Sequence, residues 1–214
     1  TQKQEKTLLV VPASLIGNWM SEIGKFSPSL KYYVYHPSEN KEIGENDGSL
    51  EEHELFITTY GMLSKYEWLT ERAWDTLILD EAQAIKNPGT KQTKLVKQIK
   101  ASYKIAMTGT PIENRLSDLW SLFDFLNKGL LGTAKEFTQF TKSMRESVNG
   151  YTRLKQVISP FILRRLKTDK TIITDLPDKI EMKTYSTLTK KQVVLYNKLV
   201  QELKLRIEST EKGI

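Results

Sequence analysis

Short apolar runs, each followed by a polar turn or a helical pattern, constrain the fold of this chain most. These runs predict strands at residues 7–11, 32–36, 55–60, 76–80 and 104–111, and the continuous apolar run at 7–11 suits a strand buried on both faces. Apolar residues at helical spacing predict helices between these runs, at residues 15–23, 91–100 and 117–127. Strands that alternate with helices predict an α/β fold with a doubly wound parallel sheet.

Polar clusters lie at the carboxyl ends of three of the predicted strands. They are Thr58-Thr59-Tyr60, Asp80-Glu81 and Thr108-Gly109-Thr110. Right-handed crossovers place the carboxyl ends of parallel strands along one edge of the sheet, where ligands bind in open α/β folds. We therefore expect the three clusters to lie at one ligand-binding edge.

The adjacent carboxylates of Asp80 and Glu81 have two interpretations. An aspartate at the end of a buried strand can hold Mg²⁺ that bridges nucleotide phosphates, and the following glutamate can accept a proton from the attacking water. A metal ion would also lower the repulsion between the two charges. The alternative is an acidic, solvated strand end. Gln83, two residues on, favours the nucleotide site only modestly.

The segments around Pro12, Ser14 and Thr58 place small hydroxyl residues at helix entrances, where amides and hydroxyls can bind backbone phosphates. The alternative for Ser14 is simple helix capping, and Ser117 is a second candidate cap. The turn at residues 108–111 can sense a phosphate or can be an ordinary turn. Lysines repeat every third residue from 91 to 100, either as a nucleic-acid stripe or as the solvated face of a helix.

Residues 130–214 differ from the rest of the chain in their pattern, which is mostly helical with a basic connector. Helical patterns occupy 135–144 and 153–159, and residues 183–188 suggest a short strand. Between them lies a basic connector, in which Arg164 and Arg165 are candidates for DNA contact, held by the apolar residues 161–163 against a core. A capping box formed by Thr189 and Gln192 opens a long helix with one apolar side, so the chain can self-associate in solution.

Composition excludes several classes of protein. There are no cysteines, and the two histidines share no ligand-like spacing, which argues against a structural zinc site. No apolar run reaches the length of a membrane helix, and the first residues lack a signal-peptide pattern. The net charge is +6, and the positive excess lies in residues 151–214, which favours a polyanionic partner.

In their order and spacing, these motifs resemble the SWI/SNF-type ATPases, DNA translocases of helicase superfamily two, in their bacterial and archaeal style. The matching stretches are residues 8–26, 57–63, 77–91, 106–132, 159–177 and 188–199. The resemblance implies a RecA-like (P-loop NTPase) lobe at 1–129, a helical protrusion and basic connector at 130–185, and a linker helix at 186–214. It also implies a cytoplasmic, nucleoid-associated protein.

The resemblance implies ATP and Mg²⁺ as cofactors, double-stranded DNA as partner, and three groups of site residues. The group for Mg-ATP is Asp80, Glu81 and Gln83, with Asp80 holding Mg²⁺ through ATP. The group that couples the ATP state to DNA contact is Thr108, Gly109, Thr110 and Pro111. The group for DNA contact is Pro12, Ser14, Thr58, Thr59, Tyr60, Asn114 and Arg115.

Two departures from the family pattern qualify the resemblance. The 214 residues contain no G-x-x-x-x-G-K-[ST] phosphate loop, and they stop before the second RecA-like lobe of the family. We therefore expect a fragment that hydrolyses little or no ATP alone, from a parent that couples hydrolysis to movement on DNA. The alternatives are another superfamily-two helicase or restriction-type ATPase, or a non-enzymatic nucleic-acid-binding module.

Overall fold

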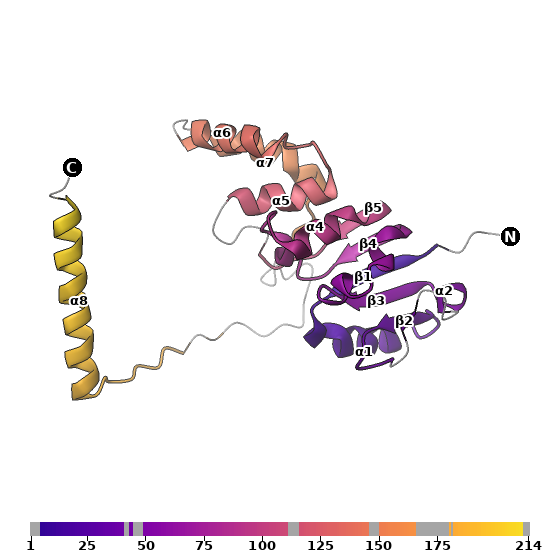
Figure 1. Cartoon of the computed structure of the whole chain (residues 1–214), viewed down its shortest axis with the longest axis horizontal. Helices are drawn as coiled ribbons and strands as arrows, with labels where there is room; N and C mark the ends of the chain where they lie inside the picture. Colours follow the sequence, from indigo (N-terminus) through magenta and orange to yellow (C-terminus); the bar gives the residue numbers. More distant parts are fainter. Residues whose placement is uncertain are drawn as a thin grey trace. The chain divides into compact units, whose positions relative to one another are not determined.

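The computed structural model describes residues 5–40, 43–44, 49–110, 116–145, 150–165, 180 and 182–211. The chain divides into two compact units, Thr1–Pro160 and Phe161–Ile214. The first unit contains the sheet and most of the helices, and the second contains one long helix (Figure 1). The predicted domain boundaries at 129 and 185 stay predictions.

The first unit is built on a five-stranded parallel sheet. Its strands are β1 (Thr7–Val11), β2 (Tyr32–Tyr35), β3 (Leu55–Thr59), β4 (Ala73–Leu79) and β5 (Lys100–Ala106). Their spatial order is β2-β3-β1-β4-β5, with β1 in the centre, and every pairing is parallel. The predicted α/β fold with a parallel sheet is confirmed, and all five predicted strands are present.

The pairing register brings the strand ends level with one another. Val10 of β1 pairs with Thr58 of β3 on one side and with Leu79 of β4 on the other. Leu79 in turn pairs with Ala106 of β5. The residues that follow β1, β3, β4 and β5 therefore emerge together at the carboxyl edge of the sheet.

Both faces of the sheet are covered at the central strands β1 and β3, as expected for parallel strands that are continuously apolar, whereas Tyr103 and Ile105 of the edge strand β5 are exposed. Successive side chains of β1 alternate between two buried clusters: Leu8 and Val10 enter one, and Leu9 and Val11 enter the other. The first cluster packs against the helical turns that follow β3 and β4, and the second packs against the helix that follows β1. This central position holds β1 rigidly at the edge where the site forms.

Short helical elements connect the strands of the first unit. After β1 come the 3₁₀ turn η1 (Ala13–Leu15) and α1 (Ile16–Phe26), and before β3 lies α2 (Ser49–Glu52). After β3 come η2 (Met62–Ser64) and α3 (Trp68–Glu71), and after β4 come η3 (Ala82–Ile85) and α4 (Lys91–Gln98). The remaining elements are α5 (Leu116–Leu126), α6 (Ala134–Arg145), α7 (Gly150–Ile158), η4 (Ser159–Phe161) and α8 (Lys190–Glu211).

Two predicted helix caps are wrong. Ser14 lies inside η1, which is closed by the backbone bond from Leu15 N to Pro12 O (2.9 Å), and no side chain caps α1. Ser117 lies within the first turn of α5, which begins one residue earlier. Helix α4 is shorter than predicted because β5 begins at Lys100, and its cap is Thr90, whose hydroxyl accepts from Thr93 N.

The lysine repeat does not form one stripe. Lys100 belongs to β5, and Lys97 forms an ion pair with Asp124 of α5 (2.7 Å). Lys97 also lies over the ring of Trp120, 5.1 Å from its centroid. These contacts link α4 to α5, so at least this lysine serves packing within the unit.

Helices α5, α6 and α7 share a small core of their own. Leu119 and Phe123 of α5 pack with Phe137 and Met144 of α6 and with Leu154 of α7. The two predicted helices after residue 130 are therefore confirmed, and they belong to the first compact unit.

In the second unit, the predicted capping box of α8 is confirmed. Thr189 N donates to Gln192 Oε1 (2.9 Å), and Gln192 N donates back to the Thr189 hydroxyl (3.4 Å). Two other expectations are wrong. Residues 183–188 form no strand, and residues 161–163 are exposed rather than packed against a core. No helix in the described residues is both long and apolar enough to cross a membrane.

Candidate functional site

The acidic pair lies where β4 leaves the sheet. Asp80 N donates to Val10 O of β1 (2.9 Å), which extends the sheet pairing by one residue. Glu81 then adopts a left-handed backbone, with φ of +50°, and the chain turns into η3. The bond from Ala82 N to Met107 O (2.9 Å) fixes this turn against the end of β5. The abrupt turn presents both carboxylates at the carboxyl edge of the sheet.

Each oxygen of the Asp80 carboxylate accepts one hydrogen bond. The indole Nε1 of Trp19 donates to Oδ2 (2.8 Å), and Glu81 N donates to Oδ1 (2.9 Å). A carboxylate oxygen can accept more than one bond, so both keep capacity for water or a metal ion. The side chain of Asp80 is therefore oriented without being saturated.

The Glu81 carboxylate begins a relay of hydrogen bonds that reaches β5. Gln83 Nε2 donates to Glu81 Oε2, and Gln83 Oε1 accepts from the Thr108 hydroxyl (2.8 Å). The Thr108 hydroxyl also accepts from Thr110 N (3.1 Å). The ends of β4 and β5 are thus joined through side chains, as well as through the sheet.

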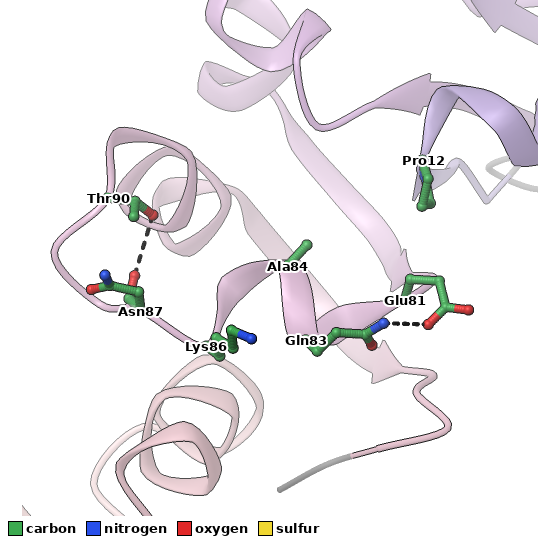
Figure 2. Close-up of a pocket in the computed structure, with 7 residues that line it drawn as sticks. All are labelled: Pro12, Glu81, Gln83, Ala84, Lys86, Asn87 and Thr90. Carbon is green, nitrogen blue, oxygen red and sulfur yellow. Dashed lines mark hydrogen bonds between the residues drawn. The ribbon is translucent and has the colours of Figure 1, made fainter. Parts of the chain in front are cut away.

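Beside this relay lies a hollow of about 530 Å³. Figure 2 shows Glu81 and Gln83 on one side of it, joined by their hydrogen bond, with Pro12 beyond them and Asn87 and Thr90 across it. Its complete lining is Pro12, Glu81, Gln83, Ala84, Lys86, Asn87 and Thr90. The volume lies in the range of small-molecule sites, and the lining offers a carboxylate, amides and a cation.

The other predicted DNA-contacting residues differ in accessibility. Ser14 is exposed in η1, next to the half-buried Pro12. Thr58 is fully buried, and its hydroxyl donates to Tyr35 O (3.1 Å). The Thr59 hydroxyl accepts from Met62 N (3.4 Å). The hydroxyls at the end of β3 thus bond within the protein, and their predicted role at DNA stays a prediction.

Tyr60 contacts the acidic pair directly. Its hydroxyl donates to the backbone oxygen of Asp80 (2.7 Å), and its side chain is only 7% exposed. Burial, followed by the negative charges of Asp80 and Glu81, raises the pKa of the Tyr60 phenol well above its ordinary value. The phenol therefore stays protonated and keeps donating at any physiological pH.

The remaining predicted residues are Gly109, Pro111, Asn114, Arg115, Arg164 and Arg165. Pro111, Asn114 and Arg115 lie outside the described residues. Gly109 is exposed in the turn after β5. Arg164 and Arg165 are exposed and belong to the second compact unit.

Four residues near the site were not predicted from the sequence as site residues. Trp19 lies in the helix predicted at residues 15–23, where it is only half-buried and bonds to Asp80. A signal was present, because the helix after β1 starts at the same sheet edge as the acidic pair. Lys86, Asn87 and Thr90 line the hollow because η3 and the loop after it fold back beside Glu81. Only the tertiary structure reveals this fold-back.

Comparison with known proteins agrees with this geometry. A family model described as the SNF2-related domain matches residues 1–213. The putative ATP-dependent helicase/translocase YwqA of Bacillus subtilis is 37% identical over 201 residues, covering 91% of this chain. An uncharacterized ATP-dependent helicase of Mycoplasma pneumoniae is 42% identical over 193 residues, covering 89% of this chain.

A solved structure has the same fold and a closely related sequence. The Sulfolobus solfataricus SWI2/SNF2 ATPase core in complex with double-stranded DNA is 43% identical, with a TM-score of 0.71 and 97% of this chain covered. This chain spans 44% of that protein, 22% of the B. subtilis relative and 18% of the M. pneumoniae relative. Because the family model covers nearly every residue, the chain belongs to the SNF2-related domain family.

Proposed function

We propose that this chain supplies the acidic and coupling residues of an ATP-hydrolysing site in a protein that moves along double-stranded DNA. The observation that carries the proposal is the relay from Glu81 through Gln83 to Thr108, which joins the ends of β4 and β5. The relatives support the same activity, since they include ATP-dependent helicases and an ATPase core in complex with DNA.

The acidic pair fits Mg²⁺ that is bound together with a nucleotide. Among the residues that the structure describes, no group of three or more acidic, histidine or cysteine side chains could hold a metal alone. Mg²⁺ in nucleotide sites is held by one or two carboxylates, water and the phosphates themselves. Asp80, oriented by two donors and not saturated, is the residue that would hold it. The ion would polarise the phosphate that is transferred.

The remaining roles are assigned to residues of this chain. Glu81 accepts a proton from the attacking water or orients that water, because its side chain lines the hollow beside η3 and Gln83 bonds to only one of its two oxygens. Gln83 bonds to Glu81 and also to Thr108, so a movement of Glu81 can shift Thr108. A change at the nucleotide can then move the turn at residues 108–110. Pro12 and Ser14 lie at the same edge, where we place the DNA backbone.

The test uses the full-length gene product that contains these 214 residues. Hydrolysis of ATP should be stimulated by duplex DNA more than by single strands or RNA, and stimulation should fall steeply with salt. Glu81→Gln should abolish turnover and retain nucleotide binding. Glu71→Gln is the matched control, because Glu71 is exposed and lies just before β4 begins, at the opposite edge of the sheet. Full turnover in Glu81→Gln would refute the proposed role.

Two further proposals concern self-association of the chain and its location in the cell. Exposed apolar side chains on α8 support self-association of the chain alone, among them Val194, Leu195 and Leu199, which are 68%, 60% and 52% exposed. Light scattering that shows a monomer at high concentration would contradict this. A DNA partner also supports a cytoplasmic, nucleoid-associated location in a bacterium or archaeon, which microscopy of a fluorescent fusion would test.

A further inference from the structure

We infer that Trp19 and Tyr60 are positioning residues that hold Asp80 from the two faces of the sheet and tie the DNA-facing segments to the metal-binding carboxylate. This inference rests on the proposed function. Trp19 packs with the cluster on one face of the sheet, and Tyr60 belongs to the cluster on the other face. Both side chains end in a single hydrogen-bond donor that is aimed at the same residue, Asp80.

The bond from Trp19 selects one orientation of the Asp80 carboxylate. Trp19 Nε1 and Glu81 N donate to different oxygens of Asp80, so the carboxylate plane is fixed by two donors (2.8 and 2.9 Å). The indole N–H can only donate, and a carboxylate oxygen is a suitable acceptor for it. Trp19 and Asp80 together line a second hollow of about 320 Å³, alongside Leu15, Asn18 and Glu22.

The bond from Tyr60 fixes the backbone at the same point. The Tyr60 hydroxyl donates to Asp80 O, while Asp80 N donates to Val10 O of β1. The peptide groups on both sides of Asp80 are therefore satisfied immediately before the left-handed turn at Glu81. The Tyr60 side chain is only 7% exposed, so little water can compete with Asp80 O for this hydrogen bond.

The two donors belong to segments that we place at the DNA. Trp19 lies in α1, one turn after η1, which contains Ser14. Tyr60 directly follows Thr58 and Thr59 at the end of β3. A shift of either segment on DNA would reach Asp80 through one hydrogen bond, without passing through Gln83 and Thr108. The acidic pair thus has two connections: Asp80 to the segments after β1 and β3, and Glu81 to the turn after β5.

The first experiment examines the hydrogen bond in this chain by NMR. The chain has four tryptophans, and Trp19→Phe assigns the indole N–H signal of Trp19. In Asp80→Asn, we expect that signal to shift more than the indole signal of Trp120. Trp120 is the control because its Nε1 donates to the backbone oxygen of Gly132 (3.0 Å). An unchanged Trp19 signal in Asp80→Asn would overturn the inference, whether or not the protein hydrolyses ATP.

The second experiment measures Mg²⁺ dependence in the full-length gene product. Loss of a residue that orients a metal ligand typically lowers metal affinity or activity about 10–100-fold. We expect Trp19→Phe to raise the Mg²⁺ concentration for half-maximal binding of a fluorescent ATP analogue by about 10-fold. Trp120→Phe, the same chemical change away from Asp80, should leave it unchanged. Tyr60→Phe, which keeps the ring, should reduce the stimulation by DNA.

The outcomes separate the inference from the proposed function. Equal Mg²⁺ dependence in Trp19→Phe and Trp120→Phe would overturn the inference. Any change in Mg²⁺ dependence would then come from replacing a tryptophan ring, and not from losing the hydrogen bond to Asp80. Melting temperatures of both variants show whether each is folded, and Asp80→Asn provides the NMR result if Trp19→Phe does not fold. If the wild-type protein binds Mg-ATP but lacks DNA-stimulated hydrolysis, the proposed function fails, and the Mg²⁺ titration still tests the positioning role.

Discussion

Removal of the Thr108 hydroxyl tests whether the relay between β4 and β5 is a coupled unit. Thr108→Val keeps the shape of the side chain and deletes two hydrogen bonds, the donation to Gln83 Oε1 (2.8 Å) and the acceptance from Thr110 N (3.1 Å). A net hydrogen bond contributes about 0.5–1.5 kcal/mol, and the low end of that range applies to each of the two bonds here because the partners are partly exposed. We expect a loss of about 1–1.5 kcal/mol.

For a chain of this size, 1 kcal/mol corresponds to a change of about 2–4 °C in melting temperature. Thr108→Val should therefore melt about 3–5 °C below the wild type, as followed by circular dichroism. A double-mutant cycle with Gln83→Leu isolates the bond between the two side chains. We expect a coupling free energy of about 1 kcal/mol, since residues in one network are not additive.

The control cycle pairs Gln83→Leu with Thr138→Val. Thr138 donates to Ala134 O within α6, a helix that contributes no residue to the relay, so the effect of its substitution should be additive with that of Gln83→Leu. A coupling below about 0.3 kcal/mol between Gln83 and Thr108, equal to the control, would show that the relay is not a unit. The proposed coupling of the nucleotide to the turn after β5 would then lose its structural basis.

Three further predictions concern local features of the fold. Thr90→Ala should destabilise the chain by about 1 kcal/mol in urea unfolding, because it removes the cap of α4. Gly132→Ala should lower the melting temperature, because φ is +68° and a new Cβ would lie 3.0 Å from Glu136 Oε2. Gly17→Ala in α1 is the control: its new Cβ meets nothing within 4 Å, so the melting temperature should not fall. Burial lowers the pKa of Lys104 below its ordinary value, so the folded state holds fewer protons than the unfolded state between that lowered pKa and 10.5. The stability of the wild type relative to Lys104→Met should therefore rise with pH across that window, in unfolding curves measured from pH 7 to 10.

The sheet and its carboxyl edge were predictable because their signals are local. Continuous apolar runs fix the strands, and the parallel pairing follows from the intervening helices. The residues after each strand must then meet, which brings Asp80 and Thr108 together without any knowledge of side-chain contacts. This part of the prediction depends on backbone geometry alone.

Side-chain partners and helix caps were less predictable because they depend on tertiary context. Trp19 looks like a core residue at helical spacing, and only the position of α1 beside β4 shows that its N–H reaches Asp80. Ser14 has the chemistry of a cap, but the 3₁₀ turn after Pro12 closes through the backbone and leaves it nothing to cap. A strand at residues 183–188 needs a partner for its backbone groups, and local propensity cannot supply one.

The left-handed backbone of Glu81 has a consequence for how this chain can evolve. Among the described residues it is the only one other than glycine with a positive φ, a conformation that glycine and asparagine adopt at much lower energy. A library screened for thermal stability alone should therefore enrich Gly and Asn at position 81. A library screened for ATP-dependent movement on DNA should retain Glu. Divergence of the two selections at this single codon would measure how much stability the lineage forgoes to keep its carboxylate.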